Sequence, residues 1–248
     1  GVRLSAAGEV LLHHIRKQLD DMKRVKGQIS DLEGERRGHV SIACSQALLT
    51  AFLPEQIALY RKAHPAVTFS VHRRDRAAAE MALVDRSADL AMVFEPVRLL
   101  DFKILLTVRQ PVFAIMSASH PLAEKQNVRL REYLEYPLAL PSSYYGVREL
   151  LEIAVRRTSG RLQPMVESDS FEFLRYQVLN ENVITFHIEI GLPSQEHSHG
   201  LVYKKIDEQD IPSGSLYIGQ LQGRTLPVAA ARFINQTLDY FDQRFECS

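Results

Sequence analysis

The sequence predicts an α/β protein with two lobes, preceded by one long helix of the kind that pairs in a coiled coil. Three observations support this prediction. Residues 4–32 carry apolar side chains with heptad spacing. Between residues 38 and 94, short β-rich segments alternate with helical patterns, as in a parallel sheet covered by helices. The same alternation restarts after His120-Pro121, which indicates a second α/β unit embedded between parts of the first.

The helix at 4–32 is defined by an apolar seam whose spacing alternates between four and three residues. Seven of the nine seam positions are Leu, Ile, Val or Met, and the exceptions are Gly8 and Gln18. Ser5 is suited to cap the N-terminus. A helix of this length extends roughly 43 Å and cannot bury its seam within itself, so a second copy of the chain is the expected partner. The residues expected to form this dimer contact are Leu11, Ile15, Met22, Val25, Ile29 and Leu32. The alternative is a helix that lies on its own globular body.

The first α/β unit is defined by its apolar runs and by its prolines. Strands are expected at 39–44, 67–72 and 88–94. Helices are expected at 51–63 and 77–84. Pro54 falls in the first turn of its helix, where a missing N–H is tolerated, and Pro65 ends that helix.

The second unit follows a pair of strands and continues the alternation. Strands are expected at 102–108, 111–117, 137–140, 163–167, 183–188, 201–206 and 214–221. Helices are expected at 130–134, 146–158, 171–179 and 227–244. Ser168 or Asp169 is the expected cap of the helix at 171–179.

The composition excludes several classes of protein. The 248 residues include 30 basic and 30 acidic side chains, so no charge excess favours wrapping nucleic acid or binding an anionic membrane. No apolar run is long enough to span a membrane, and no secretion signal is visible. Cys44 and Cys247 lie far apart, which gives no disulfide framework and fits a reducing cytoplasm. Cys44 ends a buried strand, so a small core residue is expected there rather than a redox sensor.

Catalytic motifs are absent from the sequence. There is no G-x-S-x-G, H-E-x-x-H, Walker or G-x-G-x-x-G pattern, so neither enzyme activity nor a cofactor is expected. His197 and His199 flank Ser198 in a polar loop, where histidines are more often solvated than bound to a metal. No metal site is predicted.

Polar residues follow the expected strand ends, where open α/β sheets bind ligands next to free N–H groups of helix N-termini. The candidate ligand-binding residues are Ser45, Gln46, Ala47, Phe94, Arg109, Ser142, Ser143, Tyr144 and His187. Hydroxyl, amide and N–H groups suit a small carboxylate, and Arg109 can be its counter-ion. Each serine can instead be a helix cap, His187 can be a satisfied core histidine, and Arg109 can be a surface residue.

Several segments together resemble the LysR-type transcriptional regulators. The motifs, in chain order, are Gly1-Val-Arg-Leu-Ser-Ala-Ala-Gly-Glu, Phe52-Leu53-Pro54 with His64-Pro65, Asp89-Leu90-Ala91, and His120-Pro121-Leu122-Ala123. The first is similar to the segment in which the wing of a winged helix-turn-helix continues into the linker helix. The resemblance extends from residue 1 to about 245, and the order and spacing of the motifs make it specific.

The resemblance implies a two-lobed, type-2 periplasmic-binding-protein-like domain with an effector between its lobes. It places the wing remnant and dimerisation helix at 1–34, lobe I at 38–117 plus 218–248, and lobe II at 118–217. It also implies linker helices that pair between protomers, and dimers or tetramers. The DNA-binding head is missing from the chain, so the intact protein is expected to bind DNA through it.

Two positions depart from the family's pattern. Ala47 stands where the family often has Ser or Thr, so Ser45 and Gln46 must supply the polar contacts. A Gly-x-Gly stretch of the family falls at Glu181-Asn182-Val183, without glycine. The leading interpretation is a cytoplasmic, ligand-responsive regulator of transcription. The alternative is a solute-binding module or an enzyme on the same scaffold, which would require an export signal or a convergent catalytic set.

Overall fold

The structure is a computed structural model of the chain, and it describes residues 4–32, 38–74, 76–95, 101–158, 161–193 and 200–244. The chain divides into two compact units. Unit 1 contains Gly1–Ser45, Glu55–Val108 and Tyr217–Ser248, and unit 2 contains Gln46–Pro54 and Arg109–Leu216. Residues 46–54, which the ranges implied by the resemblance include in lobe I, belong to unit 2 in this division.

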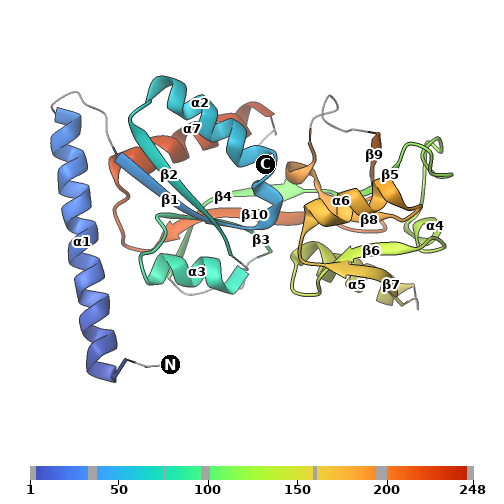
Figure 1. Cartoon of the computed structure of the whole chain (residues 1–248), viewed down its shortest axis with the longest axis horizontal. Coiled ribbons are helices and arrows are strands. Elements are labelled where there is room, and N and C mark those ends of the chain that lie inside the picture. The colour runs from blue at the N-terminus through green and yellow to red at the C-terminus, as the bar shows by residue number, and fades with distance from the viewer. Residues whose placement is uncertain are drawn as a thin grey trace. The chain divides into compact units, whose positions relative to one another are not determined.

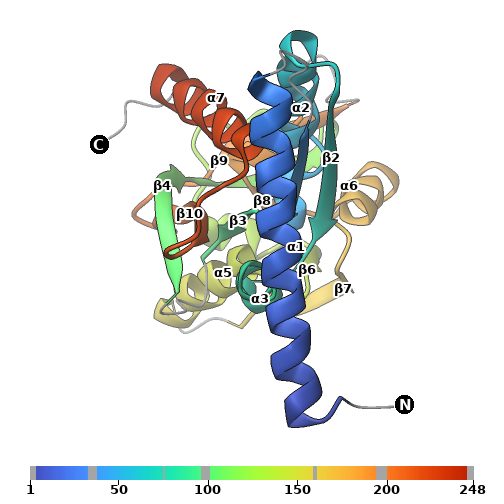
Figure 2. The ribbon, with the colours of Figure 1, turned by 90° about the vertical axis from the view of Figure 1, so that its left-hand side faces the viewer.

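The long N-terminal helix forms where the heptad pattern predicts it. Helix α1 spans Ala6–Leu32. The hydroxyl of Ser5 accepts a hydrogen bond from the backbone N–H of Gly8 at 3.2 Å, which confirms Ser5 as the N-cap. Helix α1 runs beside the globular part of unit 1 and contacts α7 (Val228–Arg244) (Figure 2). Arg16 of α1 also forms an ion pair at 3.7 Å with Asp85.

Unit 1 is built on a five-stranded sheet in the order β2-β1-β3-β10-β4 (Figure 1). The strands are β1 (Gly38–Cys44), β2 (Val67–Arg73), β3 (Leu90–Phe94), β4 (Phe102–Gln110) and β10 (Gly214–Leu221). Strand β1 pairs in parallel with both β2 and β3, which confirms the predicted parallel arrangement. Strands β4 and β10 each continue into unit 2.

Helices cover both faces of this sheet. Helices α2 (Phe52–Ala63) and α7 lie on one side and α3 (Arg76–Val84) on the other (Figure 1). On the first side, Tyr60 of α2 packs edge-on against Phe69 of β2 and Phe233 of α7, and its hydroxyl donates to the carbonyl of Ala229. On the other side the core is rich in alanine (Ala43, Ala79, Ala82, Ala88 and Ala91), together with Leu83 and Val93.

Unit 2 contains two smaller sheets. Strand β5 (Val112–Ser117) lies between β8 (Thr185–Ile188) and β9 (Leu201–Lys205), antiparallel to both. Strand β6 (Leu138–Pro141) pairs in parallel with β7 (Pro164–Ser168), and Leu138 forms a parallel bridge to Ile184 just before β8. The helices are α4 (Leu130–Tyr133), α5 (Gly146–Arg157) and α6 (Phe171–Asn180). Two short 3-10 helices, η1 (Gln46–Leu48) and η2 (Glu189–Gly191), were not expected from the sequence.

Two local details explain sequence features of unit 2. The buried His120 accepts a hydrogen bond at Nδ1 from the backbone N–H of Leu122, and its ring packs on Tyr136. The histidine of the His-Pro-Leu motif therefore stabilises a turn.

The expected cap of α6 was wrong, because the N-cap is Ser170, whose hydroxyl accepts a hydrogen bond from the N–H of Phe173. Strand β7 extends through Ser168, which leaves that residue inside the sheet.

Candidate functional site

Three strand ends of unit 2 gather at one edge, together with the starts of two helices. Strands β6 and β7 are parallel, and the bridge from Leu138 to Ile184 aligns the segment entering β8 with them. The segments that follow lead into α5 and α6, and the N–H of Ser142 donates to the carbonyl of Ser168 at 3.1 Å, which joins the two loops. This edge therefore brings hydroxyl groups and the N-termini of two helices together in one place.

Gln46 is the centre of the hydrogen bonds at this edge. Its side-chain oxygen Oε1 accepts from the hydroxyl of Tyr145 and from the backbone N–H of Phe171, each at 3.3 Å. The single hydroxyl proton of Tyr145 is shared with the carbonyl oxygen of Asp169, which is the nearer acceptor at 2.8 Å. An amide oxygen thus occupies the N-terminus of α6, where the helix favours an acceptor or an anion.

His187 forms the buried wall beside Gln46. Its side chain is nearly inaccessible, its ring lies 4.3 Å from the ring of Phe171, and Nδ1 lies 2.8 Å from the carbonyl oxygen of Ile188. Because a carbonyl oxygen can only accept, Nδ1 carries the proton in the neutral ring. Burial lowers the pKa of His187 to about 4, with a smaller contribution in the same direction from Arg175. A Cβ at Gly191 would lie 1.8 Å from Cε1 of His187, so only glycine fits against the ring.

The predicted tyrosine and serines of this edge differ in exposure. Ser142 is half-buried, whereas Ser143 and Tyr144 are exposed. The ring of Tyr144 lies 4.6 Å from that of Tyr145, which in turn lies 5.1 Å from Phe171. A row of aromatic rings therefore leads from the surface to His187. Tyr145 and Phe171 were missed in the sequence, because their role depends on contacts with Gln46.

The predicted residues of unit 1 meet at the ends of β1 and β3. The hydroxyl of Ser45 accepts a hydrogen bond from the backbone N–H of Phe94 at 3.2 Å, and the N–H of Ser45 donates to the carbonyl of Met92. The side chain of Phe94 is buried. Ala47, already in unit 2, is buried too and offers no polar side-chain contact.

Two cations of unit 2 are placed very differently. The side chain of Arg109 is 71% exposed and forms an ion pair with Glu208 at 3.3 Å. Arg109 is therefore a surface residue. Arg175 of α6 was not considered in the sequence. Its charge acts on the pKa values of His187 and Tyr203, which burial shifts away from their ordinary values. Arg175 is therefore one cation whose charge influences the buried part of this edge.

Further predictions from the sequence concern Cys44, metal ions and membrane-spanning helices. Cys44 is buried, and burial raises the pKa of its thiol to about 12, as suits an inert core residue. Among the described residues, no group of three or more His, Cys, Asp or Glu side chains could hold a metal ion. His197, His199 and Cys247 lie outside the described residues. None of the helices in the described ranges has the length and apolarity needed to cross a membrane.

The apolar seam of α1 is exposed to solvent in the single chain. The exposed fractions of Leu11, Ile15, Met22, Val25 and Ile29 run from 42% to 60%. The side chain of Leu32, the last predicted seam residue, lies outside the described part. An apolar stripe of this length left in water is a typical feature of a surface that pairs with another helix.

Comparisons with known proteins identify the family. The model of the LysR substrate binding domain matches residues 33–242. The HTH-type transcriptional regulator CysB of Burkholderia cenocepacia is 26% identical over 195 residues, which cover 76% of this chain and 58% of CysB. The chain thus spans little more than half the length of that relative.

Two solved structures share the fold. The effector binding domain of QuiR in complex with shikimate matches with a TM-score of 0.70 and 18% identity, over 84% of this chain and 99% of that domain. The regulatory domain of CcmR from Synechocystis PCC6803 in complex with 2-PG matches with a TM-score of 0.70 and 20% identity, over 82% of this chain and 97% of that domain. Both have the periplasmic-binding-protein-like α/β fold. The relatives are regulators of transcription and not enzymes, and the chain belongs to the family of LysR substrate-binding domains, the effector domains of LysR-type transcriptional regulators.

Proposed function

We propose that this chain is the sensing part of a LysR-type regulator and that a small carboxylate is its effector. The hydrogen bonds around Gln46 carry the proposal. An acceptor oxygen already occupies the N-terminus of α6, next to a tyrosine hydroxyl, a buried histidine and the field of Arg175. A ligand carboxylate can use the same donors. QuiR and CcmR, which share the fold, were solved with shikimate and 2-PG.

The predicted contacts of the effector come from both units. Gln46, Ser142, Ser143, Tyr144 and His187 belong to unit 2, where Tyr145 and Arg175 join them. Ser45 and Phe94 of unit 1 stay predicted contacts, in keeping with an effector bound between the lobes. Arg109 is replaced in this proposal by Arg175, because the side chain of Arg109 is paired with Glu208.

A thermal-shift screen tests the ligand class. The panel contains small carboxylic acids, shikimate among them, and neutral compounds of matched size. We expect acids to raise the melting temperature, and the dissociation constant of the best acid is then measured by calorimetry. Tyr145→Phe removes one hydroxyl donor and should weaken that acid about tenfold. Tyr176→Phe, an exposed tyrosine of α6, is the matched control and should leave the affinity unchanged.

Two outcomes contradict the proposed site. Stabilisation by neutral compounds alone would exclude an anionic effector. Equal affinities of wild type, Tyr145→Phe and Gln46→Ala would place the acid at another part of the chain.

The same proposal assigns α1 to dimerisation, with tetramers as a further possibility of the family. The exposed seam is the supporting observation. Sedimentation should show at least a dimer at micromolar concentration, and Met22→Lys with Ile29→Lys should weaken it because charges replace apolar seam contacts. Val10→Lys is the control, because Val10 is exposed on α1 but lies outside the seam. A monomeric wild type would refute the pairing.

The intact regulator is then proposed to bind DNA through a head that precedes α1 and to respond to the effector. An effector can shift the equilibrium between two arrangements only by its difference in affinity for them. A tenfold preference corresponds to about 1.4 kcal/mol. The paired α1 helices would transmit this shift to the two heads and to the DNA half-sites that they occupy.

A further inference from the structure

Two hydroxyl groups lie beneath α6 in unit 2, one row further into the sheet than His187. Helix α6 packs on strands β5 and β8 (Figure 1). Thr185 of β8 and Tyr203 of β9 both pair with Ile115 of β5, and directly paired residues point to the same face of a sheet. His187 points to that face too, because it lies two residues from Thr185 on the same strand. The ring contact between His187 and Phe171 shows that α6 covers this face.

Neither hydroxyl has a hydrogen-bond partner in the described part of the chain. Thr185 is only 2% exposed, and its Oγ1 is buried and unpaired. The hydroxyl oxygen of Tyr203 is buried and unpaired as well. An unpaired buried hydroxyl lowers the stability of a fold, so native proteins rarely retain one. Two such groups on one row of a sheet therefore point to a ligand group that they bind.

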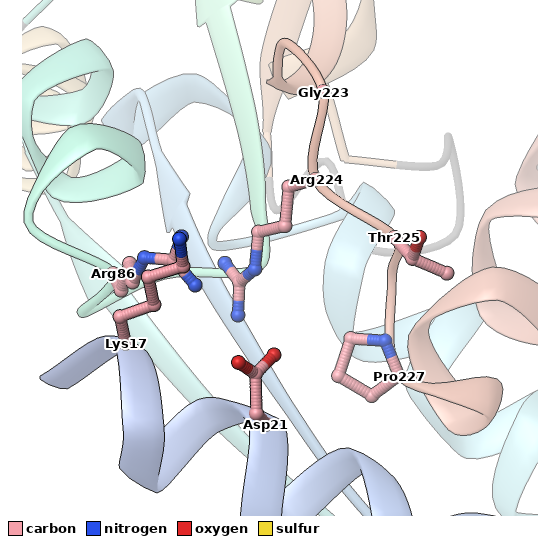
Figure 3. Close-up of a pocket in the computed structure, with 7 residues that line it drawn as sticks. All are labelled: Lys17, Asp21, Arg86, Gly223, Arg224, Thr225 and Pro227. Atoms are coloured by element: carbon pink, nitrogen blue, oxygen red, sulfur yellow. The ribbon is translucent and has the colours of Figure 1, made fainter.

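The charged groups of unit 1 differ from these hydroxyls in this respect. Figure 3 shows charged side chains from α1, from the segment after α3 and from the segment before α7 around one pocket. Arg224 is bound there to Asp89, and Asp21 and Arg86 also have interaction partners. Because these charges are already engaged, they give no indication of a ligand.

The surroundings of the two hydroxyls favour an uncharged ligand group. Burial raises the pKa of the Tyr203 hydroxyl and lowers the pKa of His187 to about 4, so both side chains are neutral at pH 7. An anion would lose its hydration at the depth of Thr185, which is costly. The carboxylate of the proposed effector therefore belongs at the N-terminus of α6, where Arg175 is its counter-ion.

His187 makes a hydroxyl more suitable than a carbonyl. Its Nδ1 carries the proton that bonds to the carbonyl oxygen of Ile188, so Nε2 of the neutral ring can only accept. The hydroxyls of Thr185 and Tyr203 can each donate or accept. A ligand hydroxyl can donate to Nε2 and accept from one of them, whereas a ligand carbonyl has no proton to donate.

We propose, on the basis of the proposed function, that Thr185 and Tyr203 bind a hydroxyl group of the effector and that the effector is a hydroxy acid. Thr185 lies roughly 7 Å along the strand from His187, because a strand rises about 3.3 Å per residue. The hydroxyl and the carboxylate of the effector are then separated by a comparable distance, which a six-membered ring or a short chain can span. Thr185 and Tyr203 thus determine specificity, by distinguishing a hydroxylated acid from a plain one.

Pairs of acids that differ only in hydroxyl groups test this site in the full chain. Calorimetry compares shikimate with cyclohexenecarboxylate, and the three hydroxybenzoates with benzoate. In at least one pair we expect the hydroxylated acid to bind about tenfold more tightly. Thr185→Val and Tyr203→Phe keep the shape of the side chain and remove its hydroxyl, so each should reduce this preference without changing the affinity for the plain acid. Thr185→Ser keeps the hydroxyl and should preserve the preference.

The stability of the free protein distinguishes a ligand contact from a structural role. Thr185→Val and Tyr203→Phe remove unpaired hydroxyls, so the urea midpoint should stay the same or rise. Thr237→Val is the matched control, because Thr237 is equally buried but its hydroxyl donates to the carbonyl of Phe233 in unit 1. This control should lower the midpoint and leave the preference for the hydroxylated acid unchanged. A lower midpoint for both Thr185→Val and Tyr203→Phe would show that their hydroxyls are structural and would overturn the site.

The affinities also distinguish a failure of this site from a failure of the proposed function. If none of the acids binds, the proposed function fails, and the hydroxyl site fails with it. If acids bind but the two members of every pair have equal affinities, only the hydroxyl site is excluded. A preference that persists unchanged in both Thr185→Val and Tyr203→Phe would place the recognition of the hydroxyl elsewhere in the chain.

Discussion

Arg224 and Asp89 form a buried ion pair that should be essential for the stability of unit 1. The exposed fractions of the two side chains are 6% and 8%, and the guanidinium Nη2 lies 2.7 Å from Oδ1 of Asp89. The other carboxylate oxygen accepts from the N–H and the hydroxyl of Ser41. The network therefore connects the segment before α7 to the start of β3 and to β1. Arg224→Met keeps much of the apolar length of the side chain but removes the charge.

The expected loss follows from burial. Arg224→Met deletes the hydrogen bonds to Asp89 and to the carbonyl of Ala88 and leaves the Asp89 carboxylate buried without its cation. Removing one partner of such a pair typically lowers the free energy of unfolding by about 3–5 kcal/mol. The matched control is Arg109→Met, because Arg109 also pairs with a carboxylate but is 71% exposed. An exposed pair of this kind contributes roughly 0–1 kcal/mol.

Urea unfolding followed by far-UV circular dichroism measures both variants. We expect a large decrease in the midpoint for Arg224→Met and a small one for Arg109→Met. In the double variant Arg224→Met with Asp89→Leu, part of the loss should be recovered, because no buried charge remains unpaired. Equal effects of the two single variants would refute the reasoning that burial, rather than the presence of an ion pair, decides the contribution.

Three further predictions concern buried groups. Because the pKa of His187 is about 4 in the folded protein and 6.5 ordinarily, the unfolded chain takes up the proton first, and stability should fall by about 3 kcal/mol between pH 6.5 and 4. Urea midpoints at pH 7, 6 and 5 should fall more steeply for wild type than for His187→Gln, and parallel curves would contradict this. Gly191→Ala should lower the melting temperature, because the new Cβ would lie 1.8 Å from the His187 ring, whereas Gly8→Ala has room and should not. The buried thiol of Cys44, with a pKa of about 12, should resist iodoacetamide at pH 8 until the protein is unfolded, as mass spectrometry of its peptide would show; rapid labelling of the native protein would refute this.

The strands and helices could be predicted because each has a local signal. Heptad spacing marks α1, and short apolar runs separated by helical patterns mark β1 to β3. The cap of α6 shows where local reasoning fails. Ser168, Asp169 and Ser170 are all acceptable caps, and the length of β7 decides among them. That length depends on pairing with β6, which lies elsewhere in the sequence.

The residues of the candidate site show the same division between local signals and contacts set by the fold. Strand ends with polar residues indicated Gln46 and His187, but not what surrounds them. Gln46 binds Tyr145 and Phe171, which are 99 and 125 positions away in the sequence. Arg109 illustrates the converse, because its charge suggested an anion site while Glu208, also 99 positions away, is its partner. Residue type indicates the available chemistry, whereas pairing across such separations is set by the fold.

The segment after β1 connects these observations to sensing. Ser45 is held by the N–H of Phe94 in unit 1, whereas the next residue, Gln46, is held by Tyr145 and Phe171 in unit 2. Two neighbouring side chains, both proposed to contact the effector, are thus fixed to different units. If the effector bonds to both residues, as proposed, it would favour the conformations of this segment in which their positions match its own geometry. Such a ligand has different affinities for different arrangements, and this difference is what a molecular switch requires.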